Sequence, residues 1–279
     1  MKDIAIILPI HEWNEDIHQL TIKAIDSVNH NKSNYIFGKL PLFIVTPPDI
    51  HSQVEETLRK CYTTEATDSM HFLINTSEHF DFCSQVNFGV KFAKQTSPSC
   101  SFFSILEFDD EYSPKWFKMA ADYYNGNEDV SVFLPVNILH TSDRDNFSFV
   151  NELVLATSFS NELGFIDFDC LQNCSLFNLT GGIFNIDDFL SVGGFKPSIE
   201  VAFNYEFLLR TTSKGLRVMV VPKEGYYHIM DRKGSLTDYY THNIDDETMQ
   251  KWFELAKREY KFDEDRKKGI INTKKEILK

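Results

Sequence analysis

The feature that most constrains this chain is a short apolar run that stops abruptly at acidic residues. Residues 102–106 read Phe-Phe-Ser-Ile-Leu, and residues 107–111 hold four carboxylates in five positions. The run favours a buried strand, and Ser113-Pro114 predicts a following helix with serine as N-cap and proline at its first position. Carboxylates this close repel one another unless a cation or a proton lies among them. Because open α/β sheets bind ligands at strand carboxyl ends, we interpret the acids as a site for a divalent cation and a phosphorylated substrate. A solvated acidic turn is the alternative.

Apolar and amphipathic segments alternate along the first half of the chain. Apolar runs predict strands at residues 4–10, 40–45, 71–74, 102–106 and 130–136. A segment with helical periodicity follows each of the first four. This order predicts an α/β fold with a mostly parallel sheet and helices on both faces.

The second half is less regular. Residues 140–171 are polar and aromatic, which indicates a lid, a substrate-facing insertion or a long irregular connection. Further strands and helices are expected at residues 176–184, from a cap at Asp187 to Gly193, at 203–213 and at 216–221. An apolar stripe behind Asp246 predicts a C-terminal helix that packs on the domain or on a second copy of the chain.

Charge is unevenly distributed along the chain. The net charge is −13, and residues 251–279 carry 10 Lys and Arg against 6 Asp and Glu, which leaves 18 against 35 in the first 250 residues. A chain whose first 250 residues carry this excess of acidic side chains is a poor nonspecific binder of nucleic acid. The basic tail could contact a polyanion or an anionic membrane surface, or could be a solvated helix face.

Cysteine content and the first residues predict the location. The five cysteines form no zinc-type pairs, which favours reduced thiols in a cytoplasmic protein. Lys2 and Asp3 lead into an apolar stretch of only Ile4 to Leu8, so we expect neither a signal peptide nor a transmembrane segment.

The turn after the first strand excludes two common nucleotide-binding classes. It reads Pro9-Ile10-His11-Glu12-Trp13-Asn14, with no glycine to admit a pyrophosphate to a helix N-terminus. The chain therefore has neither a dinucleotide fingerprint nor a P-loop.

Four motifs follow one another in a defined order. They are the opening strand with a helix ending Ala24-Ile25-Asp26-Ser27-Val28, the segment Gln85-Val86-Asn87-Phe88-Gly89, the acidic strand end Leu106 to Asp110 with Pro114, and Val192-Gly193-Gly194-Phe195 followed by Tyr205-Glu206 and Arg210. Together they resemble the GT-A-fold nucleotide-sugar glycosyltransferases of the large inverting family 2, over roughly residues 3–237. The resemblance implies a GT-A (Rossmann-like) domain at residues 1–240 and a C-terminal helical extension with a basic tail at 241–279.

The resemblance also implies a reaction and its residues. A sugar would pass from a nucleoside diphosphate, with a UDP-sugar favoured, to an acceptor hydroxyl, assisted by Mn²⁺ or Mg²⁺. The metal ligands would be Asp109 as first choice, then Glu107, Asp110 and His228. Because alternate residues of a strand point to one side, Glu107 and Asp109 are expected to face one site. The residues expected to bind the donor are Pro9, His11, Glu12, Asp49, Asn87 and Arg232.

The chain departs from the family pattern at three places. Glu107 replaces the usual first aspartate of the metal motif but keeps a carboxylate. Thr46-Pro47-Pro48-Asp49 stands where the family has an Asp-Asp-Gly-Ser-like turn, so Asp49 is the substitute expected at the nucleobase. Phe203-Asn204 aligns with the family's Glu-Asp pair, so an amide replaces the usual base. Glu206 or Glu200 must then act as the catalytic base, and Glu206 is favoured.

Several acceptors and one rival class stay open. A growing surface polysaccharide is the acceptor that the family commonly uses, while a protein or a hydroxymethylated base in viral DNA are alternatives. The acidic body disfavours DNA. A non-catalytic module that binds nucleotide sugars or carbohydrate is the rival class, supported by Asn204, and a hydrolase with paired carboxylates ranks below both. The C-terminal helix could also join copies of the chain into a homo-oligomer.

Overall fold

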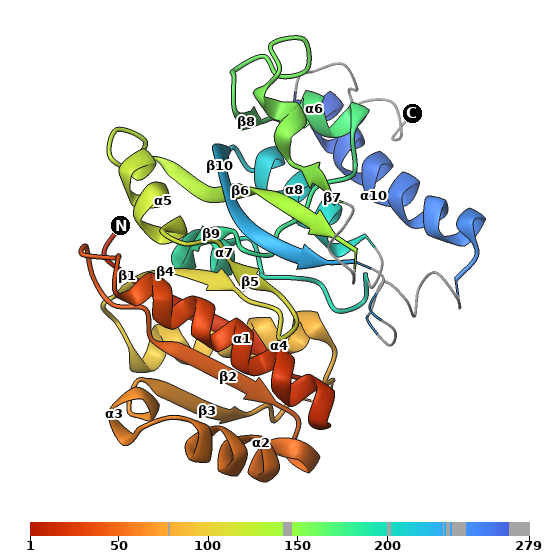
Figure 1. The fold of residues 1–279 in the computed structure, drawn as a ribbon. Coiled ribbons are helices and arrows are strands. Elements are labelled where there is room, and N and C mark those ends of the chain that lie inside the picture. Colours follow the sequence, from red (N-terminus) through yellow and green to blue (C-terminus); the bar gives the residue numbers. More distant parts are fainter. Residues whose placement is uncertain are drawn as a thin grey trace.

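The computed structural model describes residues 1–77, 79–141, 147–199, 202–230, 232, 235 and 244–267. The strands are β1 (Asp3–Pro9), β2 (Leu42–Thr46), β3 (Met70–Ile74), β4 (Cys100–Ile105), β5 (Glu111–Tyr112), β6 (Val130–His140), β7 (Phe147–Val150), β8 (Phe165–Ile166), β9 (Ile183–Asn185) and β10 (Arg217–Ile229). They form one sheet in the order β3-β2-β1-β4-β9-β6-β10-β5, with β7 paired to β6 and β8 to β10 (Figure 1). The helices are α1 (Glu15–Lys32), α2 (Pro48–Cys61), α3 (Thr64–Thr67), α4 (Phe82–Thr96), α5 (Trp116–Tyr124), α6 (Phe168–Asn173), α7 (Ile186–Ser191), α8 (Phe203–Ser213) and α10 (Asp246–Lys267), with a 3₁₀ turn η1 (Glu152–Leu155).

The N-terminal half follows the predicted order. β1 pairs in parallel with β2 and β4, and β2 pairs in parallel with β3. Every residue of β1 is buried, which explains its nearly continuous apolar run. Asn14 and Asp81 cap α1 and α4 by accepting backbone N–H bonds. The predicted α/β class, with its mostly parallel sheet and helices on both faces, is confirmed.

The C-terminal half is built around two long parallel strands, β6 and β10. They extend beyond the predicted ends at residues 136 and 221, because β7 and β5 add antiparallel pairs to the added parts of β6 and β10. β8 pairs with β10 inside its predicted range. The stretch predicted as a lid, insertion or irregular connection contains β7, η1, β8 and most of α6 among its described residues. Of the strand expected at 176–184, the structure forms only β9, which begins at Ile183.

Two predicted helix starts are wrong. α5 begins at Trp116, because the Ser113 hydroxyl donates to a distant carbonyl on β10 and Lys115 has a φ of 69°. α7 is capped by Asn185, whose side chain accepts the N–H of Asp188. The helix predicted at residues 203–213 is confirmed by α8.

The sheet separates two hydrophobic cores. Ile4, Ile6 and Leu8 of β1 face one core, which α1, α2 and α5 cover. Ala5 and Ile7 face the other, which α4, α7 and α8 cover. The two-residue period of a buried strand requires this division. The parallel pairing of β1 with β2 and β4 places the carboxyl ends of these strands at one edge.

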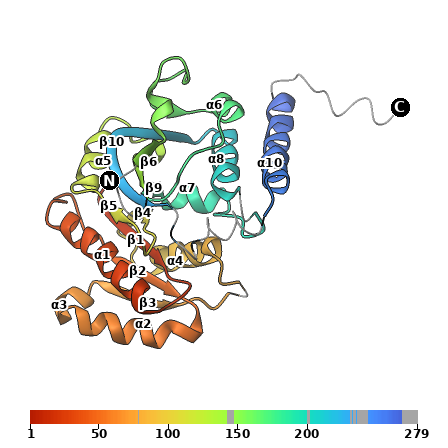
Figure 2. The same ribbon diagram turned by 45° about the vertical axis from the view of Figure 1, so that its right-hand side comes forward.

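The C-terminal helix packs on its own domain, which was one of its two predicted arrangements. α10 runs beside α8, with Ala256 and Tyr260 buried (Figure 2). Within the described ranges no helix has both the length and the apolar content needed to cross a bilayer.

Candidate functional site

Glu107, Asp109 and Asp110 lie in the turn after β4, not on the strand, and Glu111 begins β5. β4 ends at Ile105, and the Asp110 N–H donates to the Glu107 carbonyl at 3.2 Å. The predicted alternation of Glu107 and Asp109 along an extended chain is therefore wrong. The turn brings the side chains of Glu107 and Asp110 together instead.

Glu107, Asp110 and His228 form a compact group of metal-binding side chains. One ligand atom from each lies within 4.8 Å of the other two. His228 Nδ1 lies 2.8 Å from Asp110 Oδ2, and the other Asp110 oxygen accepts the Ile229 N–H at 3.0 Å. β10 thus delivers the imidazole because it continues eight residues past its predicted end.

The two carboxyl groups of this site, Glu107 and Asp110, are buried beside a single imidazole, that of His228. Burial and the neighbouring Asp110 raise the pKa of Glu107 to about 8. Burial also raises the pKa of Asp110, although His228 opposes the shift. Burial lowers the pKa of His228, but Asp110 outweighs it and raises that pKa to about 10. Carboxylate oxygens suit both Mn²⁺ and Mg²⁺, while an imidazole nitrogen suits Mn²⁺ better than Mg²⁺, so the residues present fit the expected cation with Mn²⁺ favoured.

Asp109 points to a second polar group, outside these three residues. Its Oδ2 lies 2.5 Å from Arg232 Nε, and Arg232 Nη1 lies 3.7 Å from Glu12 Oε1. The guanidinium also lies 5.0 Å from the centre of the Phe108 ring. The structure therefore brings Asp109, the predicted first ligand, against a cationic side chain beside the metal-binding group.

Two of the predicted donor-binding residues lie near this guanidinium, and a third, Pro9, ends β1 just before them. The His11 ring lies 5.3 Å from the Phe108 ring in a tilted arrangement, and Glu12 lies within ion-pair distance of Arg232. The structure thus brings them together at the carboxyl ends of β1 and β4, where the sheet order reverses direction.

Asp49 stands after the carboxyl end of β2, the strand that pairs with β1. It is an exposed residue in the first turn of α2. Beside it, the buried Thr46 hydroxyl lies 2.9 Å from His51 Nδ1 at the end of β2. Sequence reasoning did not single out His51, because this contact joins the end of a strand to the first turns of the next helix and no local spacing encodes it.

Asn87 has a structural role, which corrects its predicted place in donor binding. Its Nδ2 donates to the Phe195 carbonyl at 2.7 Å, and its Oδ1 accepts the Phe195 N–H at 2.9 Å. Gly194 is required beside it, since a Cβ there would lie 2.4 Å from the same Oδ1. Both ends of the amide are therefore occupied by the turn between α7 and α8.

Glu206, the favoured catalytic base, is not placed for that role. Its side chain is 1% exposed, and its oxygens are bound by Arg210, Lys196 and Tyr260. A carboxylate closed off in this way cannot receive an acceptor hydroxyl, so we withdraw the assignment. Glu200, the other predicted base, lies outside the described residues.

Comparison with solved structures defines the class of fold. The chain has the fold of the GT-A nucleotide-sugar glycosyltransferases. Structures of S. aureus TarS are among those that are similar to it. Residues 1–349 of TarS in complex with UDP-GlcNAc match with a TM-score of 0.60 at 15% identity, over 92% of this chain and 65% of that one. The complex with UDP gives 0.54 at 14% identity over the same shares, and a further TarS structure gives 0.56 at 15% over 86% and 38%.

The likeness has definite limits. This chain spans less than two thirds of those TarS chains, 65% and 38% of their lengths. At such identities the comparison establishes the fold alone. No protein-family model matches the sequence, and no curated protein matches it.

Proposed function

We propose that this protein is a metal-dependent, inverting glycosyltransferase that uses a nucleoside-diphosphate sugar, with a UDP-sugar favoured. The observation that carries the proposal is the group of Glu107, Asp110 and His228 at the carboxyl end of the sheet. The fold supports it, because TarS 1–349, which shares that fold, has been crystallised with UDP-GlcNAc and with UDP.

The residues of the group have separate tasks in this reaction. Glu107, Asp110 and His228 would hold the cation, with Asp109 beside them. When bound, Mn²⁺ or Mg²⁺ supplies Lewis-acid stabilisation of the leaving diphosphate. Arg232, which lies against Asp109, would pair with phosphate oxygens and orient them.

Inversion requires a carboxylate that accepts the proton of the attacking hydroxyl. Glu206 is excluded by its burial, so Glu200 is the residue that we propose for this role. The sequence supports the choice, because Glu200 lies four residues before Asn204, the position of the family's base.

For the acceptor we propose a surface polysaccharide. The 18 basic against 35 acidic side chains in residues 1–250 count against duplex DNA carrying a hydroxymethylated base. All five cysteines are free, which supports the proposed cytoplasmic location. Association of copies through α10 stays a prediction, supported by the partly exposed Trp252 and Leu255.

One observation favours a second candidate function. Asn204 stands in place of the family's base, so a non-catalytic module that binds nucleotide sugars is the alternative. The two functions differ in turnover and not in binding.

The test combines binding and turnover on the full chain. A thermal-shift panel of UDP, UDP-GlcNAc and other nucleotide sugars, with Mn²⁺, Mg²⁺ or chelator, should show stabilisation that needs the cation. Release of the nucleoside diphosphate with a panel of glycans then measures transfer. Cation-dependent binding without release would support the module. Absence of both binding and release would refute the proposal.

A further inference from the structure

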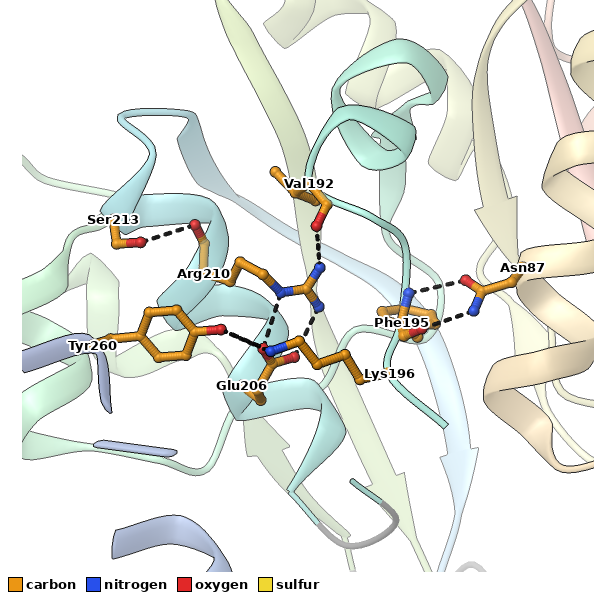
Figure 3. Close-up of polar contacts among 8 residues, drawn as sticks. All are labelled: Asn87, Val192, Phe195, Lys196, Glu206, Arg210, Ser213 and Tyr260. Carbon is orange, nitrogen blue, oxygen red and sulfur yellow. Dashed lines mark hydrogen bonds and ion pairs between the residues drawn. The ribbon is translucent and has the colours of Figure 1, made fainter. Parts of the chain in front are cut away.

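Glu206 joins three separate segments of the chain (Figure 3). Its Oε1 lies 2.9 Å from Arg210 Nε, 2.8 Å from Lys196 Nζ and 2.5 Å from the Tyr260 hydroxyl. Its Oε2 accepts from Arg210 Nη2 at 2.8 Å. A buried carboxylate is costly unless its oxygens are satisfied, so the three segments together compensate one charge.

Two of these partners hold the turn between α7 and α8. Lys196 follows the turn directly, and Arg210 Nη1 donates to the Val192 carbonyl before it at 2.5 Å. From the opposite side, Asn87 of α4 binds both backbone groups of Phe195. The turn is therefore fixed from α4 and from α8.

The third partner comes from the C-terminal extension. Tyr260 of α10 lies 54 residues after Glu206, and its hydroxyl also accepts from Lys196 Nζ at 3.2 Å. Towards the start of α10, Phe253 packs on Tyr205 of α8 with ring centroids 5.6 Å apart. The helix thus meets α8 through one apolar contact and one polar contact, two turns apart.

We infer that Tyr260 is a positioning residue: it fastens α10 to α8 and thereby fixes the first turn of α8, which carries Asn204 at the position of the family's base. Asn204 lies in that turn, and its Oδ1 is buried with no hydrogen-bond partner among the described residues. Displacement of a reacting group by about 1 Å can cost on the order of a hundredfold in rate. The predicted effect on sugar transfer rests on the proposed function, whereas the latch, which is the contact of Tyr260 on α10 with Glu206 on α8, does not.

The experiment compares two Tyr→Phe variants of the full chain. Tyr260→Phe keeps the ring and removes the hydroxyl. Tyr62→Phe is the matched control, since the Tyr62 hydroxyl donates to Asp26 Oδ1 at 3.0 Å and ties α2 to α1, far along the chain from α8. Hydrogen–deuterium exchange over α8 and α10 reports the latch. UDP release from UDP-GlcNAc, with the best acceptor of the glycan panel or with water, reports kcat and the donor KM.

Tyr260→Phe should speed exchange in α8 and α10 at least tenfold, lower kcat at least fivefold and leave the donor KM within twofold. Tyr62→Phe should change none of these. Unaltered exchange in Tyr260→Phe overturns the latch, and faster exchange with unaltered kcat overturns the positioning role. If the unsubstituted protein releases no UDP, the proposed function fails for this donor, and exchange still decides the latch.

Discussion

Two acidic sites in this molecule are compensated in opposite ways. At the end of β4, the carboxylates of Glu107, Asp109 and Asp110 outnumber the basic side chains of His228 and Arg232 among the described residues. Because these carboxyls are buried close together, the pKa of Glu107 is raised to about 8, and this carboxyl takes up a proton at neutral pH when no cation is bound. A surplus of this kind suits a cation from solution.

On α8 the balance is reversed. The single carboxylate of Glu206 meets two cationic side chains and a hydroxyl. Burial raises its pKa, but hydrogen bonds from these three donors outweigh burial and hold the pKa below its usual range. The comparison teaches that the balance of charge separates the two sites: a single acid matched by two cations joins segments of the fold, while acids that outnumber the cations beside them form a candidate binding site.

The largest expected effect tests the excess of carboxylates over basic side chains after β4. Asp110→Asn should lower transfer on the order of a thousandfold and abolish the Mn²⁺-dependent stabilisation by UDP, because one ligand and one charge are lost. Asp109→Asn should have a smaller effect, because Asp109 lies against Arg232. UDP release and thermal shift measure both variants.

Asp122→Asn is the control for this pair, since Asp122 forms an exposed ion pair with Lys118. Unchanged UDP affinity with Mn²⁺ in both Asp109→Asn and Asp110→Asn would mean that the acids at β4 do not hold a cation. A larger loss in Asp109→Asn would return Asp109 to the position of first ligand.

The next largest effect tests the contacts of Glu206 with Lys196, Arg210 and Tyr260. Glu206→Gln should destabilise the fold by about 3 kcal/mol, since removing one partner leaves buried cations uncompensated. The melting temperature should fall by roughly 10 °C while UDP affinity is retained. Thermal unfolding and titration with UDP measure the two quantities. A variant with full stability and no transfer would restore Glu206 as the base.

A smaller effect is expected on the other side of the same turn. Asn87→Ala should destabilise the fold by about 2 kcal/mol, because the N–H and carbonyl of Phe195 lose their partners. Asn173→Ala removes an exposed amide that bonds within α6 and is the control. Urea unfolding measures the loss. A loss of UDP affinity without a loss of stability would return Asn87 to donor binding.

The smallest expected effect is a difference in pH dependence. Because the pKa of Glu206 is lowered in the folded state, its contribution is present above the usual glutamate pKa of about 4.3 and is lost as pH falls through the folded value. The free energy of unfolding should therefore fall more steeply with decreasing pH below about pH 4.3 in the unsubstituted protein than in Glu206→Gln. The difference between the two slopes corresponds to at most one bound proton. Urea midpoints between pH 3 and 6 give the slopes, and equal slopes would contradict this account.

Sequence patterns predicted the parts of the fold that depend on near neighbours. The bounds of α8 and the strand that leads to the acids are of this kind, because periodicity and apolar runs are local. The turn at Glu107 to Asp110 was missed, since apolar Leu106 prolonged the run and the turn depends on one backbone hydrogen bond.

The role of Glu206 could not be predicted for a different reason. Its spacing of four residues from Arg210 was visible in the sequence and typical of a helical ion pair. The contacts with Lys196 and Tyr260 depend on packing of the turn and of α10 against α8, and no local pattern encodes them. A carboxylate expected to act as a base was therefore one that the tertiary fold encloses.

The separation of Glu206 from its partners also sets an order of events during synthesis. Arg210 is four residues away, so this pair can form with the first turns of the helix, whereas Tyr260 is 54 residues later. At about 5–20 residues per second, a ribosome needs roughly 3–11 s to add that length. During this interval the Glu206 carboxylate can pair with Arg210 but not with Tyr260. The contact that fastens the C-terminal helix to α8 forms only after that helix has been synthesised.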